Sequence, residues 1–399
     1  MSVVGEAVAR RAHALDFRFG DAREAWVVWA CFALLVVIVR LDAVYSIENV
    51  FAIYREAGLR WRGGEELYPA QLHFNYFPPS AVLFAAWSWL PFGIGGALWR
   101  IVNLAAFAFG LWKISRDSDR PLPAAHFLIA TVVTVVLSAS AARYGQMTLA
   151  MAGFMMAAVT YAERGALWRA AICAALAVAL KPLAVVLVLL LAGIYPRLIW
   201  RMACALAAVF LSPFLFQHAD YVWRQYAAVP TMLAARAGQP EGWQQHIFGL
   251  LDELGWTATG TQQTIIRGVS AVFVLFLCWH VRRRAPRIGV ALSIYAFATC
   301  YILLLGSGTE RNTYAMLTPV IGLAAAAAWS ARDRGLLGLM SAVIGLHLLS
   351  HTLQRAHPHT VLAMLKPAAC LVVAAWLVWT ALRAPLEASP RVKPAGSSP

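Results

Sequence analysis

Long apolar runs separated by short polar segments fill most of this chain. A helix needs about 20 apolar residues to cross a bilayer, and runs near that length recur about 12 times. They cover residues 25–43, 96–114, 124–143, 146–163, 166–181, 182–198, 200–217, 265–282, 288–306, 314–330, 335–353 and 362–383. The pattern predicts an all-α integral membrane protein, a polytopic bundle of about 12 transmembrane helices.

One further apolar run, 78–93, is short and carries Pro78, Pro79 and Pro91. The positive-inside rule decides how it is placed. If it crossed the membrane, the basic run 282–284 would face outside; if it does not cross, most arginines and lysines fall on the cytoplasmic side. We therefore expect 78–93 to be a re-entrant segment in the outer leaflet. Irregular backbone at that depth is tolerated against protein or a wet cavity, so a cavity is expected there.

This arrangement gives a simple domain organisation. Residues 1–24 form a cytoplasmic N-terminus, 25–383 one transmembrane domain, and 384–399 a cytoplasmic tail. Two outer loops are long, 44–77 and 218–264. The second is equally compatible with acceptor binding and with packing alone. Three outer points are short: 143–146, Lys181-Pro182 and 306–313.

Composition agrees with a membrane protein and excludes other classes. The 399 residues are 61% hydrophobic and 13% charged, against roughly 25% charged in soluble proteins. A net charge of +14 alone would suggest nucleic acid, but the basic residues lie in clusters between apolar runs. We therefore expect no nucleic-acid partner. The six cysteines lie within apolar runs without ligand spacing, so no metal site is predicted.

Four motifs share the predicted outer side. They are Asn49-x-Phe51-x-Ile53-Tyr54…Gly64…Leu67-Tyr68 followed by Tyr76-Phe77-Pro78-Pro79; Gly145-Gln146; a small-residue helix over 170–180 ending in Lys181-Pro182; and Glu310-x-x-Thr313-Tyr314. In this order, over residues 25–330, the chain resembles the family 87 glycosyltransferases, membrane enzymes of the C-type glycosyltransferase fold.

The resemblance implies an activity. That family uses polyprenyl-phosphate sugars, typically the mannose donor. We therefore expect a hexosyltransferase that moves a sugar, mannose first, from a polyprenyl-phosphate donor to a lipid or glycan acceptor. The partners would be the bilayer, the donor and the acceptor, at the periplasmic face of a bacterial inner membrane. No cofactor is expected; some relatives of the fold use a divalent cation, but no acidic pair stands out here.

The resemblance also implies a catalytic base, an Asp in the first outer loop shortly before the aromatic residue that corresponds to Tyr54. Here that stretch reads Glu48-Asn49-Val50. A carboxylate must remove the proton of the acceptor hydroxyl. Glu48 is the first candidate and Asp42, at the end of the first span, the second. Alternatively, Glu48 is a solvated glutamate at the membrane interface, and Asp42 is a helix-end residue at the level of the lipid headgroups.

Candidate substrate-binding residues come from the same motifs. Lys181 and Arg143 are candidates for the donor phosphate, which a cation binds well; otherwise Lys181 snorkels to the surface and Arg143 anchors at the headgroups. Glu310 binds substrate or, alternatively, pairs with Arg311 and caps the next helix. The remaining substrate-binding candidates are Gln146, Arg311, Tyr54 and Tyr76, of which Tyr76 could line the sugar or lipid groove.

Two other functions fit parts of the pattern. A transporter or lipid flippase also has many spans, but the sequence shows no inverted repeat and no matched pair of broken helices. An O-antigen ligase or polymerase also handles polyprenyl-linked glycans, and its large outer loop lies late in the chain, so that loop 218–264 is a partial match.

Overall fold

The computed structural model describes residues 22–40, 49–116, 124–237, 245–284, 289–356 and 364–384, in which the regular elements are helices. They are α2 (Arg23–Arg40), α3 (Val50–Gly63), α4 (Pro78–Trp87), α5 (Phe92–Arg116), α6 (Ala124–Tyr144), α7 (Thr148–Glu163), α8 (Leu167–Leu180), η1 (Pro182–Ala184), α9 (Val185–Ile194), η2 (Pro196–Leu198), α10 (Ile199–Leu211), η3 (Ser212–Leu215), α11 (Ala219–Ala237), α12 (Ile247–Glu253), α13 (Gly260–Arg282), α14 (Val290–Leu305), η5 (Arg311–Leu317), α15 (Thr318–Ala331), α16 (Arg334–Ala356) and α17 (Leu365–Leu382).

The predicted all-α membrane class is confirmed. Within the described residues, six helical segments are long and apolar enough to cross a membrane. They are Phe92–Arg116, Ala125–Tyr144, Pro196–Leu215, Gly260–Arg282, Arg311–Ala331 and Leu365–Leu382. Several other apolar helices are shorter, among them α8 and α14. The count of about 12 spans therefore stays a prediction.

Residues 78–93 form a short helix and a turn. Pro78 and Pro79 occupy the first positions of α4, where the missing proline N–H groups cost nothing. The helix has 10 residues, and at about 1.5 Å per residue it covers about half of a hydrocarbon core. It is too short to cross, as the charge distribution predicts.

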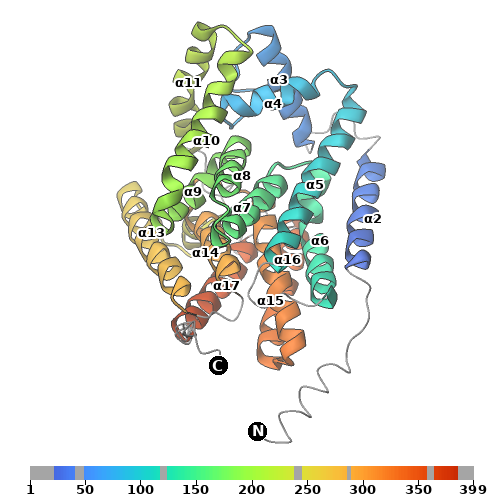
Figure 1. Cartoon of the computed structure of the whole chain (residues 1–399), viewed down its shortest axis with the longest axis vertical. Helices are drawn as coiled ribbons and strands as arrows, with labels where there is room; N and C mark the ends of the chain where they lie inside the picture. Colours follow the sequence, from blue (N-terminus) through green and yellow to red (C-terminus); the bar gives the residue numbers. More distant parts are fainter. Residues whose placement is uncertain are drawn as a thin grey trace, which may run out of the picture.

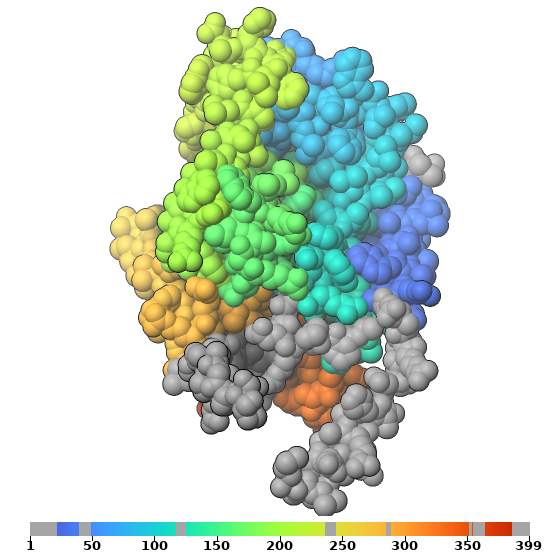
Figure 2. Space-filling view, in the orientation of Figure 1, coloured from blue at the N-terminus to red at the C-terminus, as the bar shows by residue number. Residues whose placement is uncertain are grey.

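Helices α3, α4 and α11 gather at one end of the molecule, at the top of Figure 1, beyond the main bundle. Helices α3 and α11 belong to the two segments predicted as long outer loops, 44–77 and 218–264, and α4 belongs to the predicted re-entrant segment 78–93. In Figure 2 the surface of this end is formed by α3 to α5, in blue to cyan, and by α10 and α11, in yellow-green. Each predicted loop therefore contains helix: α3 in the first, and α11 and α12 in the second.

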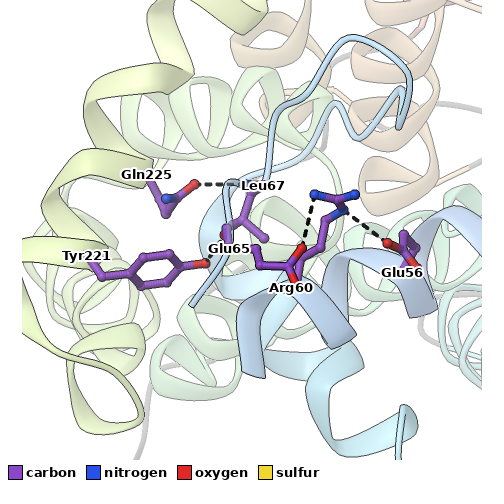
Figure 3. A network of polar contacts seen from close by, with 6 residues as sticks. All are labelled: Glu56, Arg60, Glu65, Leu67, Tyr221 and Gln225. Atoms are coloured by element: carbon purple, nitrogen blue, oxygen red, sulfur yellow. Dashed lines mark hydrogen bonds and ion pairs between the residues drawn. The ribbon is translucent and has the colours of Figure 1, made fainter. Parts of the chain in front are cut away.

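Polar contacts join these two segments (Figure 3). Gln225 of α11 accepts a hydrogen bond from the backbone N–H of Leu67 at 3.0 Å, and the Tyr221 hydroxyl donates to the carbonyl of Glu65 at 2.7 Å. On α3, Arg60 pairs with Glu56 at 3.0 Å and with Glu65 at 3.3 Å. Two acids of the first outer segment, Glu56 and Glu65, therefore pair with the same arginine.

Helix α7 lies in the interior of the bundle, and most of its residues are buried. Small residues allow it to approach α5 closely, as membrane helices often do. A Cβ placed on Gly153 of α7 would overlap the backbone of Ala106, and one on Gly110 of α5 would overlap the backbone of Gly153. Because backbone cannot move aside cheaply, both positions require glycine.

We expect Gly153→Ala to lower the free energy of unfolding by about 1–3 kcal/mol, the usual effect of overpacking. The matched control is Gly268→Ala on α13, where an added Cβ meets no atom within 4 Å; there alanine's higher helix propensity should be neutral or stabilising. Thermal unfolding of both variants in detergent checks this. Equal melting temperatures would contradict the close α5–α7 approach.

Candidate active site

The Gly145-Gln146 motif is the turn between α6 and α7. Gly145 has φ +70°. Helices often end at a residue in this left-handed conformation, which glycine adopts readily. The N–H of Gln146 donates to the carbonyl of Ala141, and Gly145 donates to Ala142. Trp99 of α5 fixes the turn by donating from Nε1 to the Gly145 carbonyl at 2.8 Å. The start of α7 is thereby placed in the interior.

The Lys181-Pro182 motif is a break between α8 and η1. The residue before a proline is driven out of the helical region, and Lys181 is extended, with φ −149° and ψ 128°. Its side chain is nevertheless 2% exposed. Nζ donates to Thr148 Oγ1 at 3.2 Å and to Thr313 Oγ1 at 3.4 Å. A buried ammonium thus joins three helix breaks.

Two predicted aromatic residues meet beside this lysine. The hydroxyls of Tyr54 on α3 and Tyr76 are 3.2 Å apart, with the rings edge to face. The backbone N–H of Met147, next to Thr148, donates to the Tyr54 hydroxyl at 3.3 Å. The first outer segment therefore reaches the start of α7, where Lys181 also binds.

Glu310 immediately precedes η5, the turn whose Thr313 binds Lys181. Its N–H donates to Thr313 Oγ1 at 3.3 Å, and its side chain is exposed. Burial raises the pKa of Tyr54 well above its ordinary value, with Tyr76 and, more weakly, the negative charge of Glu310 adding to the effect. Through Thr313, which also binds Lys181, the Glu310 turn adjoins this lysine.

We call Tyr54, Tyr76, Thr148, Lys181 and Thr313 the polar cluster. It brings together segments that are far apart in the sequence, and among the predicted site residues it includes Tyr54, Tyr76 and Lys181. Glu310 adjoins it through Thr313. Gln146, 4% exposed, adjoins it through Met147.

Arg143 is placed differently from Lys181. Its side chain is exposed and lies 6.0 Å from the Tyr144 ring centre. The buried guanidinium here belongs to Arg100 of α5, which donates to the carbonyls of Gly96 and Arg143 and, at 3.0 Å, to Asn49 Oδ1. The sequence analysis missed Arg100, although an arginine within an apolar span is itself a signal.

Asn103 is a second residue that the sequence analysis missed. It lies one turn after Arg100 on the same face of α5. Its Nδ2 donates to the Gln146 carbonyl at 2.6 Å, and its Oδ1 accepts from the N–H of Ala150 at 2.7 Å. Asn103 therefore binds two backbone groups at the start of α7, one of them the N–H of Ala150, which has no helical partner there.

The two candidate bases, Glu48 and Asp42, lie outside the described residues. The description resumes at Asn49, which is 4% exposed and bound to Arg100. Arg311, the remaining candidate, is half-buried, and its carbonyl accepts a hydrogen bond from Lys366 of α17 at 3.2 Å.

A groove of about 410 Å³ opens under α3 and α4. It is lined by Trp61, Arg62, Val82, Ala85, Ala86, Trp89, Phe216 and Gln217. Arg62 lies 3.8 Å over the Trp89 ring and donates to Ser88 Oγ. The groove is lined by residues of the predicted re-entrant segment, but by none of the polar cluster.

Within the described ranges, no three His, Cys, Asp or Glu side chains lie together as a metal site would require. His246, in the second outer segment, caps α12 by accepting from the N–H of Gly249 at 3.2 Å. Burial, with the nearby positive charge of Arg267, lowers its pKa to about 4. It is therefore a neutral capping residue at pH 7.

Comparison with known proteins gives one family match. The model for Glycosyltransferase family 87 matches residues 74–308, a range that includes Tyr76, Arg143, Gln146 and Lys181. No curated protein matches the chain significantly. Among solved structures, a crystal structure of ArnT from Cupriavidus metallidurans bound to undecaprenyl phosphate is similar at 15% identity, over 89% of this chain and 76% of that one, with a TM-score of 0.40.

Proposed function

Because the chain belongs to glycosyltransferase family 87, we propose that it transfers a hexose, mannose in the first instance, from a polyprenyl-phosphate sugar to a lipid or glycan acceptor. The reaction would take place at the outer face of a bacterial inner membrane. Family membership favours this reading over a transporter, a flippase or an O-antigen ligase.

The observation that carries the proposal is the burial of Lys181 at the meeting point of three helix breaks. Sugar transfer from a lipid phosphate needs a cation at the departing phosphate, and such preorganised charge is the largest catalytic effect in many enzymes. An ammonium in low dielectric is costly, so a protein keeps one where it has a use. Lys181 supplies the cation, and Tyr54 and Tyr76 supply a surface for a sugar ring. Glu310, which forms a capping box with Thr313, adjoins them.

The mechanism assigns each group a task. A carboxylate of the first outer segment, Glu48 or Asp42, takes the proton of the acceptor hydroxyl. At the same time the hydroxyl oxygen attacks the anomeric carbon of the donor sugar. The bond from that carbon to the donor phosphate breaks, and the phosphate leaves with the electron pair, stabilised by Lys181. Arg100 holds Asn49, the residue after Glu48, and so positions this segment.

The test uses membranes that contain the protein and radiolabelled polyprenyl-phosphate mannose, with label in lipid or glycan as the readout. We expect Glu48→Gln to lower the transfer rate by about 10²–10⁴, the usual contribution of a general base, and Asp42→Asn to have a much smaller effect. The reverse result would assign the base to Asp42.

Two outcomes would contradict the proposal. If both variants transferred sugar at the wild-type rate, no base would come from this segment. If wild-type membranes moved the labelled donor across the bilayer without forming a new glycosidic bond, the chain would be a flippase and not a transferase.

A further inference from the structure

The C-terminal ends of α13 and α17 lie side by side, at the end of the molecule opposite α3, α4 and α11 (Figure 1). The guanidinium of Arg284, just after α13, donates to the carbonyl of Ala384, just after α17, at 3.2 Å. Both helices are long and apolar enough to cross a membrane. Because the positive-inside rule places the basic run 282–284 in the cytoplasm, this hydrogen bond joins two span ends at the predicted cytoplasmic boundary.

Each of these two helix ends carries the same pair of side chains. On α13, Cζ of Arg283 lies 3.5 Å from the ring centre of Trp279, and on α17, Cζ of Arg383 lies 4.6 Å from that of Trp379. In both pairs the arginine lies one helical turn after the tryptophan, on the same face. The tryptophans are 44% and 49% exposed, and both arginines are exposed. We call these the two Arg-Trp pairs.

Three arginines at these helix ends keep their charge unmatched within the part of the chain that the structure describes. Arg283, Arg284 and Arg383 pair with no carboxylate there, whereas the neighbouring Arg282 binds Glu163 at 3.4 Å. A cation at a helix C-terminus gains from the helix dipole, but that gain requires no tryptophan beside it. Exposed tryptophans at the end of a span are typical of contact with lipid headgroups. The two Arg-Trp pairs therefore present cations to the headgroup region.

Phosphate is the anion that suits this arrangement. A guanidinium stacked on an aromatic ring still has its planar fork of donors available, and that fork binds two phosphate oxygens at once. Helix α13 is little buried along its span, so lipid reaches its end directly. Because the two Arg-Trp pairs stand on adjoining helix ends, a lipid that carries two phosphates can engage both of them.

We propose that the adjoining ends of α13 and α17 form a binding site for an anionic phospholipid with two phosphates, of the cardiolipin type. One phosphate binds Arg283 beside Trp279, and the other binds Arg383 beside Trp379. The lipid is a stabilising ligand, which holds together two helix ends that one hydrogen bond already joins. The inference does not depend on the proposed function, because neither pair belongs to the polar cluster.

The test measures lipid binding to the purified full chain in detergent by native mass spectrometry, with tetraoleoyl cardiolipin as the probe. We expect Arg283→Gln and Arg383→Gln each to weaken its binding about fivefold, and the double variant about 25-fold, since one basic residue near an anionic membrane surface contributes on that scale. The matched control is Arg201→Gln. Arg201 lies 4.4 Å over the exposed ring of Trp200 as a single pair at the start of α10, and its removal should leave cardiolipin binding unchanged.

Three other probes identify the ligand chemistry. Phosphatidylglycerol, with one phosphate, should bind more weakly than cardiolipin, and phosphatidylcholine, with no net charge, more weakly still. Inorganic phosphate should compete with cardiolipin only at much higher concentration. Equal binding of phosphatidylglycerol would overturn the site for two phosphates, and equal binding of phosphatidylcholine would overturn an anionic ligand. Competition by inorganic phosphate at the concentration of the lipid would overturn a lipid ligand.

Melting temperatures separate lipid binding from folding. Because Arg283 and Arg383 are exposed, both variants should unfold within about one or two degrees of wild type when no lipid is added. A ligand that binds only the folded state raises its stability, so cardiolipin should raise the melting temperature of the wild type and of Arg201→Gln more than that of the double variant. Cardiolipin binding that stayed at the wild-type level in the double variant would overturn the inference.

Discussion

Replacing Lys181 with Met should reduce sugar transfer by about 10²-fold or more, the scale seen when one preorganised donor to a developing anion is removed. Lys181 is the buried ammonium that joins α7, α8 and the Glu310 turn. Met has a similar length and no charge, so it fills the space and removes only the electrostatic contribution. The rate of transfer from radiolabelled polyprenyl-phosphate mannose, measured against donor concentration, gives both kcat and KM.

Two further variants make this result specific. Lys181→Arg retains the charge and should recover part of the rate. Lys113→Met removes a lysine that lies 5.0 Å over the Tyr161 ring, far along α5, and should transfer at the wild-type rate. If Lys181→Met kept its melting temperature and its full kcat and KM, Lys181 would be a structural lysine and the site would lie elsewhere.

The sequence predicts the class of fold well. Each apolar run must be buried in the protein or face lipid, and the length of each run can be counted directly in the sequence. It also predicts the local breaks: Pro182 drives Lys181 out of the helix, and Gly145 supplies the left-handed residue that ends α6. The residues at those two breaks lie near Tyr54 in the structure. Motifs on the same side of a membrane protein are restricted to one end of the helix bundle, which brings them close together.

The sequence analysis failed where tertiary packing decides. It placed the polar residues of interest in loops and so passed over Arg100, Asn103 and Lys366, all within apolar runs. Their partners are backbone carbonyls, an amide and turn residues distant in sequence, and no local pattern encodes such pairs. The exposure of Arg143 and the burial of Arg100 could not be separated by residue type, since both were arginines near the same predicted membrane boundary.

Arg100 should be the most important polar residue for stability. Its guanidinium donates to the carbonyls of Gly96 and Arg143 and to the Asn49 amide, while 3% of the residue is exposed. Hydrogen bonds from a charged group contribute about 1.5–3 kcal/mol each. Arg100→Met leaves buried oxygens without a donor, so we expect a loss of about 3 kcal/mol or more in the free energy of unfolding.

The matched control is Arg143→Met. It removes an exposed guanidinium but keeps the carbonyl that Arg100 binds, so its melting temperature should stay within a degree or two of wild type. Because Arg100 holds Asn49, which follows the proposed base Glu48 in the sequence, Arg100→Met should also lower kcat more than it raises KM. Arg100→Lys keeps the charge without the planar fork and should fall between the two. Equal melting temperatures for Arg100→Met and Arg143→Met would contradict the buried network, and with it the argument that α5 fixes the segment carrying the base.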